Sequence, residues 1–146
     1  MNSELGLIWQ KILIQNNYRV TTPRQAVVNV IASANRIQNA MEVYLEARTF
    51  CAGLGLVTVY RTIEKLEELG LVQRVHLSNG CHSYIASAEG HQHLLICSKC
   101  NRAEYFSGDD LNPLIGDLGE KRGYLINDHW LQLSGICVEC QKQGNE

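Results

Sequence analysis

Two Cys-x-x-Cys pairs constrain this chain more than any other feature of its sequence. Four of the six cysteines form the pairs Cys97/Cys100 and Cys137/Cys140. A tight turn between two cysteines three positions apart places both thiolates on one side, so two such pairs can supply the four corners of a tetrahedral zinc site. Such a site stabilises the folded state, because the unfolded chain has no preformed cage. The sequence therefore predicts a structural Zn²⁺ that joins a C-terminal strand to the start of a small subdomain.

A redox role for the cysteines is the alternative. A single Cys-x-x-Cys pair can be a catalytic dithiol, which leaves a thiol oxidoreductase open. Neither pair opens a helix in a thioredoxin-like βαβ pattern, and two pairs together favour zinc. We expect Cys51 to pack as a small apolar residue at a helix end. Cys81, in a probable turn, is an exposed thiol or a metal-ligand candidate.

The compartment follows from what the sequence lacks. The N-terminal residues show no basic start, apolar core or small-residue cleavage site, so we expect no signal peptide and a cytoplasmic protein. Persistent disulfides are not expected in that compartment. No apolar run approaches the roughly 18 residues that a membrane-spanning helix needs, so no membrane partner is expected.

Helical periodicity dominates the first half of the chain. The stretch Thr21-Thr22-Pro23-Arg24 offers an N-cap threonine followed by proline at the first helical position. Thr58 can cap a later helix, which Gly70 would end. Apolar residues recur at helical spacing in four segments, residues 5–13, 22–34, 40–45 and 58–69.

Alternating residues follow the last of these helices. Residues 72–76 and 82–85 flank Ser78-Asn79-Gly80, a pattern typical of a β-hairpin. Helices followed by a hairpin are the outline of a winged helix-turn-helix, whose last helix enters the major groove of double-stranded DNA. Its outer face offers four DNA-binding candidates, Thr58, Tyr60, Arg61 and Lys65. The alternative is a zinc-stabilised scaffold whose solvated helix face carries these residues without a DNA role.

Charge is divided unevenly between the two halves. Residues 1–88 hold eight Lys or Arg and six acids, whereas residues 89–146 hold five bases and nine acids. A polyanion would prefer the mildly basic first half. This excess is small, so charge by itself is weak evidence for nucleic-acid binding.

The second half reads as a separate, smaller domain. We expect an α+β fold with a winged helix-turn-helix DNA-binding domain over 1–86, a hinge over 87–90, and a small α/β dimerisation and metal-binding domain over 91–146. Within the last domain, the pattern predicts strands over 91–97, 102–106 and 124–134 and a helix over 109–121. A three-stranded antiparallel sheet with one helix has exposed edges and a thin core. Pairing with a second copy would remedy both, and a homodimer would match a palindromic DNA site.

Four sequence motifs together resemble the ferric uptake regulator family. They are Thr22-Pro23-Arg24, Gly55-Leu56-Val57-Thr58-Val59-Tyr60-Arg61, the run from Gly90 to Cys100, and Gly135-Ile136-Cys137-Val138-Glu139-Cys140. Their order and spacing extend the resemblance over nearly the whole chain. The resemblance implies a dimeric, metal-responsive transcriptional regulator, usually a repressor, from a family that includes iron, zinc, manganese, nickel and peroxide sensors. It also implies a DNA-reading role for Tyr60 and Arg61 and a structural zinc on the two cysteine pairs.

The site that the family usually uses for sensing is altered in this chain. The matching positions fall near Ile37, Ile85, Gln92 and Leu94. None of these side chains is a good metal ligand.

The resemblance implies a second, regulatory metal site within the dimerisation domain. Its positions match His91, His93 and His129, with Asn112 where the family has an acid and Asp110 as a possible substitute. Three imidazoles and one oxygen suit Zn²⁺, and Fe²⁺ is also compatible. In a rival arrangement Leu94 or Leu95 is an insertion. His91 and His93 then supply the sensing site together with His76, Cys81 or His82 from the hairpin, the wing of the winged helix.

The expected function is a metal-responsive repressor of metal-homeostasis genes that binds palindromic operators as a dimer when loaded with zinc or iron. The alternatives are a peroxide-responsive regulator of the same family and a thiol oxidoreductase. No nucleophile–base pair and no phosphate-binding loop is seen in the sequence, so we do not expect an enzyme.

Overall fold

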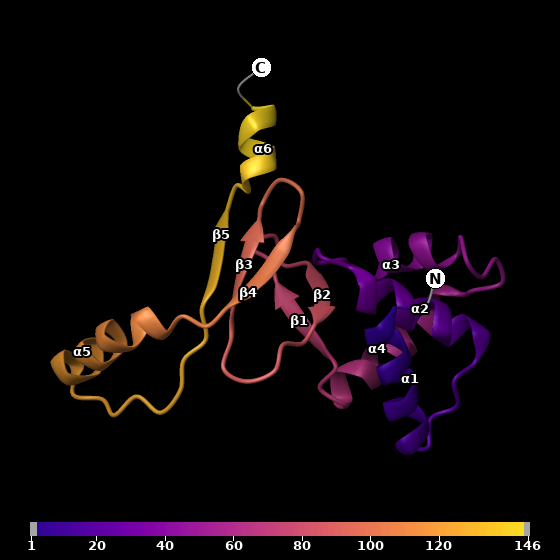
Figure 1. Ribbon diagram of the computed structural model, residues 1–146, viewed down its shortest axis with the longest axis horizontal. Helices are drawn as coiled ribbons and strands as arrows, with labels where there is room; N and C mark the ends of the chain where they lie inside the picture. The colour runs from indigo at the N-terminus through magenta and orange to yellow at the C-terminus, as the bar shows by residue number, and fades with distance from the viewer. Residues whose placement is uncertain (1–2, 145–146) are drawn as a thin grey trace. The chain divides into compact units, whose positions relative to one another are not determined.

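The chain forms two compact units in a computed structural model that describes residues 3–144 (Figure 1). The boundary lies between Ser87 and Ala88. Each unit is described below by itself.

Four helices build the N-terminal unit, as the periodicity predicts. Side-chain caps set the start of three of them, because Ser3, Thr21 and Asn39 each accept a backbone N–H from the first helical turn. Asn39 and Glu42 form a reciprocal capping box. The helices are α1 (Glu4–Gln15), α2 (Thr22–Ser33), α3 (Ala40–Ala47) and α4 (Leu56–Glu68).

The start of α4 differs from the prediction. Gly55, not Thr58, is the N-cap residue, and no side chain caps this end. Thr58 lies inside the first turn, where its carbonyl accepts the Thr62 hydroxyl at 2.7 Å. The prediction of a Thr58 cap is therefore wrong, because the helix begins one turn earlier. Its other end is as predicted: Gly70 has φ +70°, a left-handed conformation that favours glycine.

The core of the N-terminal unit lies between the helices. Val59, Ile63 and Leu66 on the inner face of α4 are at most 1% exposed. They pack with buried apolar side chains of the other three helices, including Trp9, Leu13, Val27, Val28, Ile31 and Val43. Burying each such large side chain contributes about 1.5–3 kcal/mol. The opposite face of α4 is therefore left for another role.

The predicted hairpin follows α4. Strands β1 (Val72–His76) and β2 (His82–Ala86) pair antiparallel, with His76 directly opposite His82. Gln38 adds an isolated bridge to the free edge of β2 by exchanging two backbone hydrogen bonds with Tyr84, at 3.1 and 2.8 Å. Helices and hairpin together give the winged-helix outline.

The C-terminal unit contains a three-stranded sheet in the order β4-β3-β5. Strand β3 pairs antiparallel with β4 and parallel with β5. The expectation of an all-antiparallel sheet is wrong, because the long connection through α5 crosses over and brings β5 in along the direction of β3. The elements are β3 (His93–Cys97), β4 (Ala103–Phe106), η1 (Asp109–Leu111), α5 (Asn112–Arg122), β5 (Gln132–Gly135) and α6 (Val138–Gln143).

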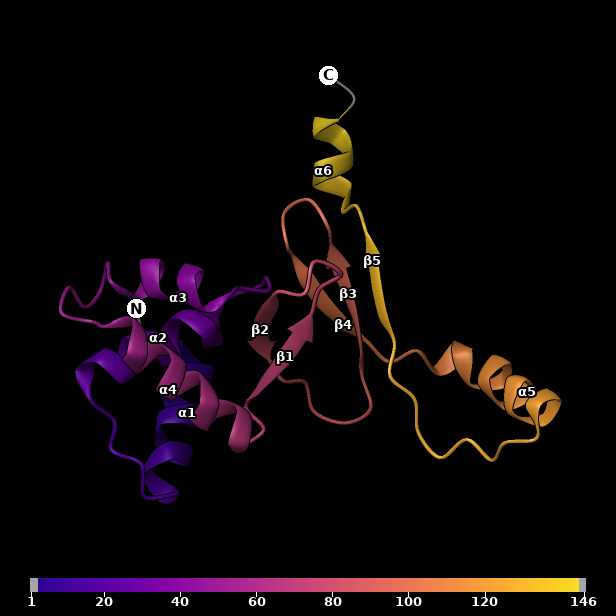
Figure 2. The same cartoon turned by 180° about the vertical axis from the view of Figure 1, so that it is seen from behind.

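Strand β5 is much shorter than predicted. Only Gln132–Gly135 joins the ladder, and residues 124–131 form neither strand nor helix. The physical reason is the lack of a partner: Gln132 pairs with Leu94, and β3 begins only one residue earlier at His93. Figures 1 and 2 show α5 and α6 at opposite ends of this sheet.

The C-terminal unit has little apolar core. Among its described residues, the buried hydrophobic side chains are Leu94, Ile96, Cys97 and Cys140. Many large apolar residues of this unit are exposed, such as Leu114 at 66% and Leu133 at 47%. A unit this small and thinly packed needs stabilisation from elsewhere.

Candidate functional sites

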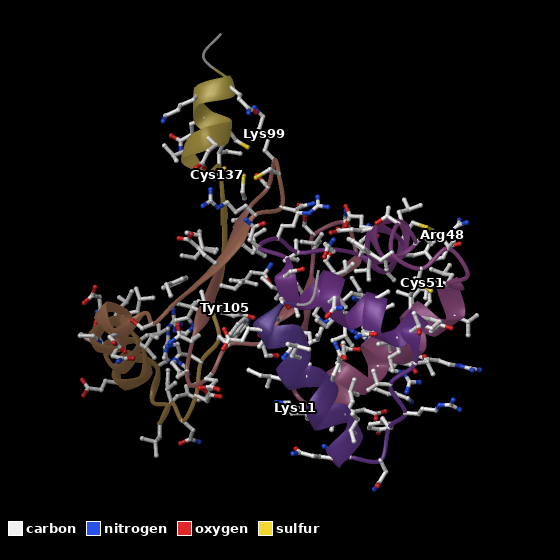
Figure 3. The ribbon with its side chains drawn as sticks, turned by 45° about the vertical axis from the view of Figure 1, so that its right-hand side comes forward. Lys11, Arg48, Cys51, Lys99, Tyr105 and Cys137 are labelled. Atoms are coloured by element: carbon white, nitrogen blue, oxygen red, sulfur yellow. The ribbon has the colours of Figure 1, made fainter. Side chains whose placement is uncertain are left out.

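Four cysteines converge at the α6 end of the sheet. Their Sγ atoms all lie within 4.8 Å of one another, and those of Cys100 and Cys137 are 3.7 Å apart. A tetrahedron with metal–sulfur distances of about 2.3 Å has edges of about 3.8 Å, which this spacing fits. Figure 3 shows Cys137 beside Lys99 of the β3–β4 turn, with sulfur atoms gathered between them. The four-residue set Cys97, Cys100, Cys137 and Cys140 favours a closed metal cage over a redox pair.

The parallel pairing of β3 and β5 brings the two cysteine pairs together. Cys97 lies opposite Gly135 in the ladder, and the Ser98 N–H donates to the Gly135 carbonyl at 2.8 Å. Both strands therefore end at the same edge of the sheet, and the Cys-x-x-Cys turns that follow them lie side by side. Asn101, with φ +64°, closes the first turn.

Hydrogen bonds within the cluster favour the thiolate form of Cys97. The Cys137 N–H donates to Cys97 Sγ at 3.3 Å, and this bond, with further backbone N–H groups of the turn, lowers the pKa of Cys97 to about 6. The neighbouring sulfurs raise the pKa of Cys140, first through its contact with Cys137. Crowded thiolates repel one another, so a bound cation is what would let all four lose their protons.

Three histidines converge at the other end of β3. Ligand nitrogens of His91, His93 and His129 lie within 4.8 Å of one another. The Nε2 atoms of His91 and His129 are 3.2 Å apart. Two nitrogens bound tetrahedrally at about 2.05 Å from a zinc ion would be about 3.3 Å apart, so this geometry fits the ion.

His93 is the buried member of the histidine cluster. Its ring is 0% exposed, and its Nδ1 accepts the Leu131 N–H at 3.2 Å. Its Nε2 is buried with no hydrogen-bond partner among the described residues. Desolvation, followed by the neighbouring His91 and His129, lowers the pKa of His93 and favours the neutral ring, the form that binds metals.

The two oxygen ligands proposed from the sequence are placed differently. Asn112, at the start of α5, lines an open cavity together with His91 and His129. Asp110 lies exposed in η1 and does not line that cavity. Asp110 does not belong to the histidine group.

Sequence reasoning missed Asp128. Its Oδ1 lies 3.6 Å from His91 Nδ1 and accepts the His129 backbone N–H at 2.8 Å. The only sequence signal was its position next to His129, in a stretch that was expected to be a strand with neighbours on opposite faces.

The wing residues of the rival arrangement are not part of either cluster. Within residues 3–144, two groups of three or more potential ligands are found, and His76, Cys81 and His82 belong to neither. The His76 and His82 rings instead pack edge to face, with centroids 4.9 Å apart. Cys81 is exposed, and Cys51 packs half-buried against the core of the N-terminal unit.

The positions of the altered sensing site are mostly apolar and buried. Ile37 and Leu94 are 0% exposed and Ile85 is 6% exposed. Gln92 is half-buried.

The outer face of α4 presents the predicted DNA-binding residues unequally. Tyr60 is 49% exposed and Arg61 is exposed, whereas Thr58 and Lys65 are half-buried. The Lys65 ammonium lies 4.9 Å from the centre of the Tyr18 ring. The structure adds one feature that the sequence analysis did not single out, the exposed apolar side chain of Val57 at 62%.

Within residues 3–144, no helix is both long enough and apolar enough to span a bilayer.

Comparison with known proteins extends over nearly the whole chain. The ferric uptake regulation protein of Legionella pneumophila is 34% identical over 125 residues, which are 84% of this chain and 91% of that protein. That of Bacillus subtilis (strain 168) is 30% identical over 141 residues, 94% of this chain and 95% of that protein. The structure of the Vibrio cholerae ferric uptake regulator superposes with a TM-score of 0.68 at 26% identity, covering 88% of this chain and 98% of that one.

The family match itself covers residues 15–134, from the end of α1 into β5, and so includes α4 and the histidine cluster. It confirms the resemblance stated from the motifs. This chain belongs to the ferric uptake regulator family.

Proposed function

We propose that this protein is a metal-responsive transcriptional repressor of metal-homeostasis genes. It binds palindromic operators as a homodimer when its histidine cluster holds Zn²⁺ or Fe²⁺. The observation that carries the proposal is that one chain combines an exposed Tyr60–Arg61 helix face with two clusters of metal-ligand side chains.

The DNA-reading role rests on α4. The inner face of α4 is buried in the core, so the exposed face is free to enter a groove of DNA. Arg61 can bond guanine or a phosphate, and the Tyr60 ring can contact a base edge or the backbone. Thr58 and Lys65 lie at the margins of this face. We assign the unit up to Ser87 as the DNA-binding domain, in keeping with the DNA-binding domains named for the Vibrio cholerae relative.

The four-cysteine cluster would hold a structural zinc ion. Its sulfurs have tetrahedral spacing, and the lowered pKa of Cys97 assists loss of the first proton. The ion, when bound, would link the β3–β4 turn to the start of α6 and so supplement a thin apolar core.

The histidine cluster would hold the regulatory metal through His91, His93 and His129. The unpartnered Nε2 of His93 supports this assignment, because a buried ring nitrogen without a partner is costly. A ring that ligates through Nε2 keeps its proton on Nδ1. Nδ1 of His93 would then donate rather than accept, so the Leu131 N–H would have to turn away from it. Loading of the cluster is in this way coupled to residues 124–131.

A homodimer is supported by the apolar surface of the C-terminal unit. Leu95 and Leu133 pair across β3 and β5 and are both exposed. Leu114 and Leu118 on α5 are also more than half exposed. Contiguous exposed apolar surface marks an interaction site. A second copy would cover it and give the twofold symmetry that a palindromic operator requires.

DNA selection and binding measurements test this function. Duplexes would be selected from a random library with Zn²⁺-loaded protein, and their affinity measured by fluorescence anisotropy with and without Zn²⁺ or, anaerobically, Fe²⁺. We expect selection of palindromes and tighter binding in the presence of one of these metals. Arg61→Ala should weaken binding about 10–100-fold, the equivalent of about 1–3 kcal/mol for one base contact. His91→Ala/His93→Ala should retain one zinc ion per chain and lose the metal response.

The matched control is Arg122→Ala, which removes the same charge from the exposed end of α5. Binding that is equally strong without metal, or equal effects of Arg61→Ala and Arg122→Ala, would contradict the proposal.

A further inference from the structure

We infer that Asp128 is the positioning carboxylate of the histidine cluster, holding His91 and His129 in place for a divalent cation. This inference rests on the proposed metal-binding role of that cluster and names a residue that the four-ligand pattern expected from the sequence did not contain.

A single oxygen of Asp128 reaches two of the three histidines. Its Oδ1 accepts the backbone N–H of His129 at 2.8 Å and lies 3.6 Å from the Nδ1 of His91. The first contact fixes the backbone from which the His129 ring projects. The second lies on the side of the His91 ring away from the cluster, because the other nitrogen of that ring, Nε2, faces His129 Nε2 at 3.2 Å.

The position of Asp128 favours the tautomer of His91 that can bind a metal. Its Oδ1 atom lies beyond hydrogen-bond length from Nδ1, and a carboxylate on this side of the ring favours the proton on Nδ1 and leaves the lone pair of Nε2 free for an ion. Removing a carboxylate partner of a metal-binding histidine typically weakens metal binding 10–100-fold.

The location of Asp128 explains how it can act in spite of its exposure. Its side chain is 85% exposed, so its contribution as a simple surface charge would be small. Its effect depends instead on geometry, since His129 lies outside the ladder, two residues before Leu131, whose carbonyl accepts the Leu94 N–H of β3 at 3.1 Å. The Asp128–His129 hydrogen bond supplies part of that geometry.

The two oxygen ligands proposed from the sequence lack these contacts. Asp110 lies exposed in η1 and makes no described contact with any of the three histidines. Asn112 shares a cavity with His91 and His129 and is neutral.

The matched control is an aspartate outside the site. Asp117 carries the same charge as Asp128, lies exposed on α5, pairs with Lys121 at 2.8 Å and does not line that cavity. Asp117→Ala is therefore a charge-matched control for Asp128→Ala.

Titration of a second zinc ion tests this inference. Protein that already holds one Zn²⁺ per chain would be titrated with Zn²⁺ against a chromophoric chelator, for the wild type, Asp128→Ala, Asp128→Asn and Asp117→Ala. We expect Asp128→Ala to weaken binding of the second ion 10–100-fold. Asp128→Asn, which keeps an acceptor oxygen without the charge, should fall between Asp128→Ala and the wild type, and Asp117→Ala should stay within about twofold of the wild type.

Long-range ¹H–¹⁵N correlation spectra add a readout that loss of folding alone would not mimic. In the zinc-loaded wild type we expect His91 to be protonated on Nδ1, with this signal shifted in Asp128→Ala. If Asp128→Ala fails to keep its first zinc ion, the role of Asp128 is tested with Asp128→Asn, by the same zinc titration and the same spectra.

The possible failures are distinguishable. A wild-type protein that takes up no second ion overturns both the proposed metal site and the role of Asp128. A second ion that binds Asp128→Ala as tightly as the wild type, or that binds Asp117→Ala and Asp128→Ala equally weakly, overturns the role of Asp128 alone.

Discussion

At the scale of single residues, the close approach of Gly108 to His93 is the tightest constraint on the histidine cluster. Gly108 has φ +67°, and a Cβ atom added there would lie 2.3 Å from His93 Cδ2 and 2.8 Å from its Nε2. Real Cβ atoms do not approach other atoms so closely, and a buried ring has nowhere to move. The lack of a side chain at Gly108 therefore leaves room for the His93 ring.

We predict that Gly108→Ala weakens binding of the second zinc ion and leaves the first in place. The control is Gly123→Ala, because Gly123 has a similar φ of +73° but nothing within 4 Å of an added Cβ. Both variants should lose about 1 kcal/mol from the left-handed backbone. Only Gly108→Ala should also lose affinity for the ion in the chelator titration. Equal affinities in the two variants would show that the His93 contact is not needed.

At the scale of elements, α4 illustrates how one helix divides its faces. The core buries Val59, Ile63 and Leu66. Tyr60 and Arg61 stay exposed on the opposite face. Periodicity alone predicts this division, because it depends only on spacing along the helix. Periodicity does not predict which residues of other segments contact the sides of α4. The loop after α1 places Tyr18 against the flank of α4, where its hydroxyl donates to Glu68 at 3.2 Å and its ring lies below the Lys65 ammonium.

Lys65 should accordingly contribute less to DNA binding than Arg61. Its half-buried side chain is engaged with Tyr18, whereas Arg61 is exposed. We predict that Arg61→Ala, which removes an exposed charge from the DNA-facing side of α4, reduces the slope of log affinity against log salt by up to about 0.9, the value for one phosphate contact. Lys65→Ala should change it by much less. The measurement is anisotropy on the selected operator across a salt series, and equal slopes for the two variants would reject this ranking.

At the scale of the whole molecule, the two units differ in what holds them together. The N-terminal unit has a core to which all four helices contribute. The C-terminal unit buries four hydrophobic side chains among its described residues, and two of these are cysteines of the sulfur cluster. Its stability must therefore come largely from zinc and from association with a second copy.

Removal of zinc should unfold the C-terminal unit and spare the other. With a strong chelator and a reductant present, we expect amide hydrogen exchange to lose protection in β3, β4 and β5 and to keep it in α2 and α4. Cys81→Ser, which alters an exposed thiol outside the cluster, should behave as the wild type. Strands that remain protected after the ion has left would contradict the structural role of the four cysteines.

Features that depend on neighbours along the chain are predictable from the amino-acid sequence. Helical spacing predicts α1 to α4, the turn Ser78-Asn79-Gly80 predicts the hairpin, and two Cys-x-x-Cys pairs predict the four-sulfur cluster. Together with the order of the motifs, these are enough to identify the family. Each is a short-range signal, since a turn or a helix face is set within a few residues.

The tertiary structure alone decided how distant segments meet. The direction of β5 and its short length depend on where β3 begins and ends, which no local pattern records. For the same reason Asp128, which residues 124–131 bring to His91, was found only in the folded chain. Strand pairing and ligand geometry are relations between residues far apart in sequence, so they become visible only when the chain has folded.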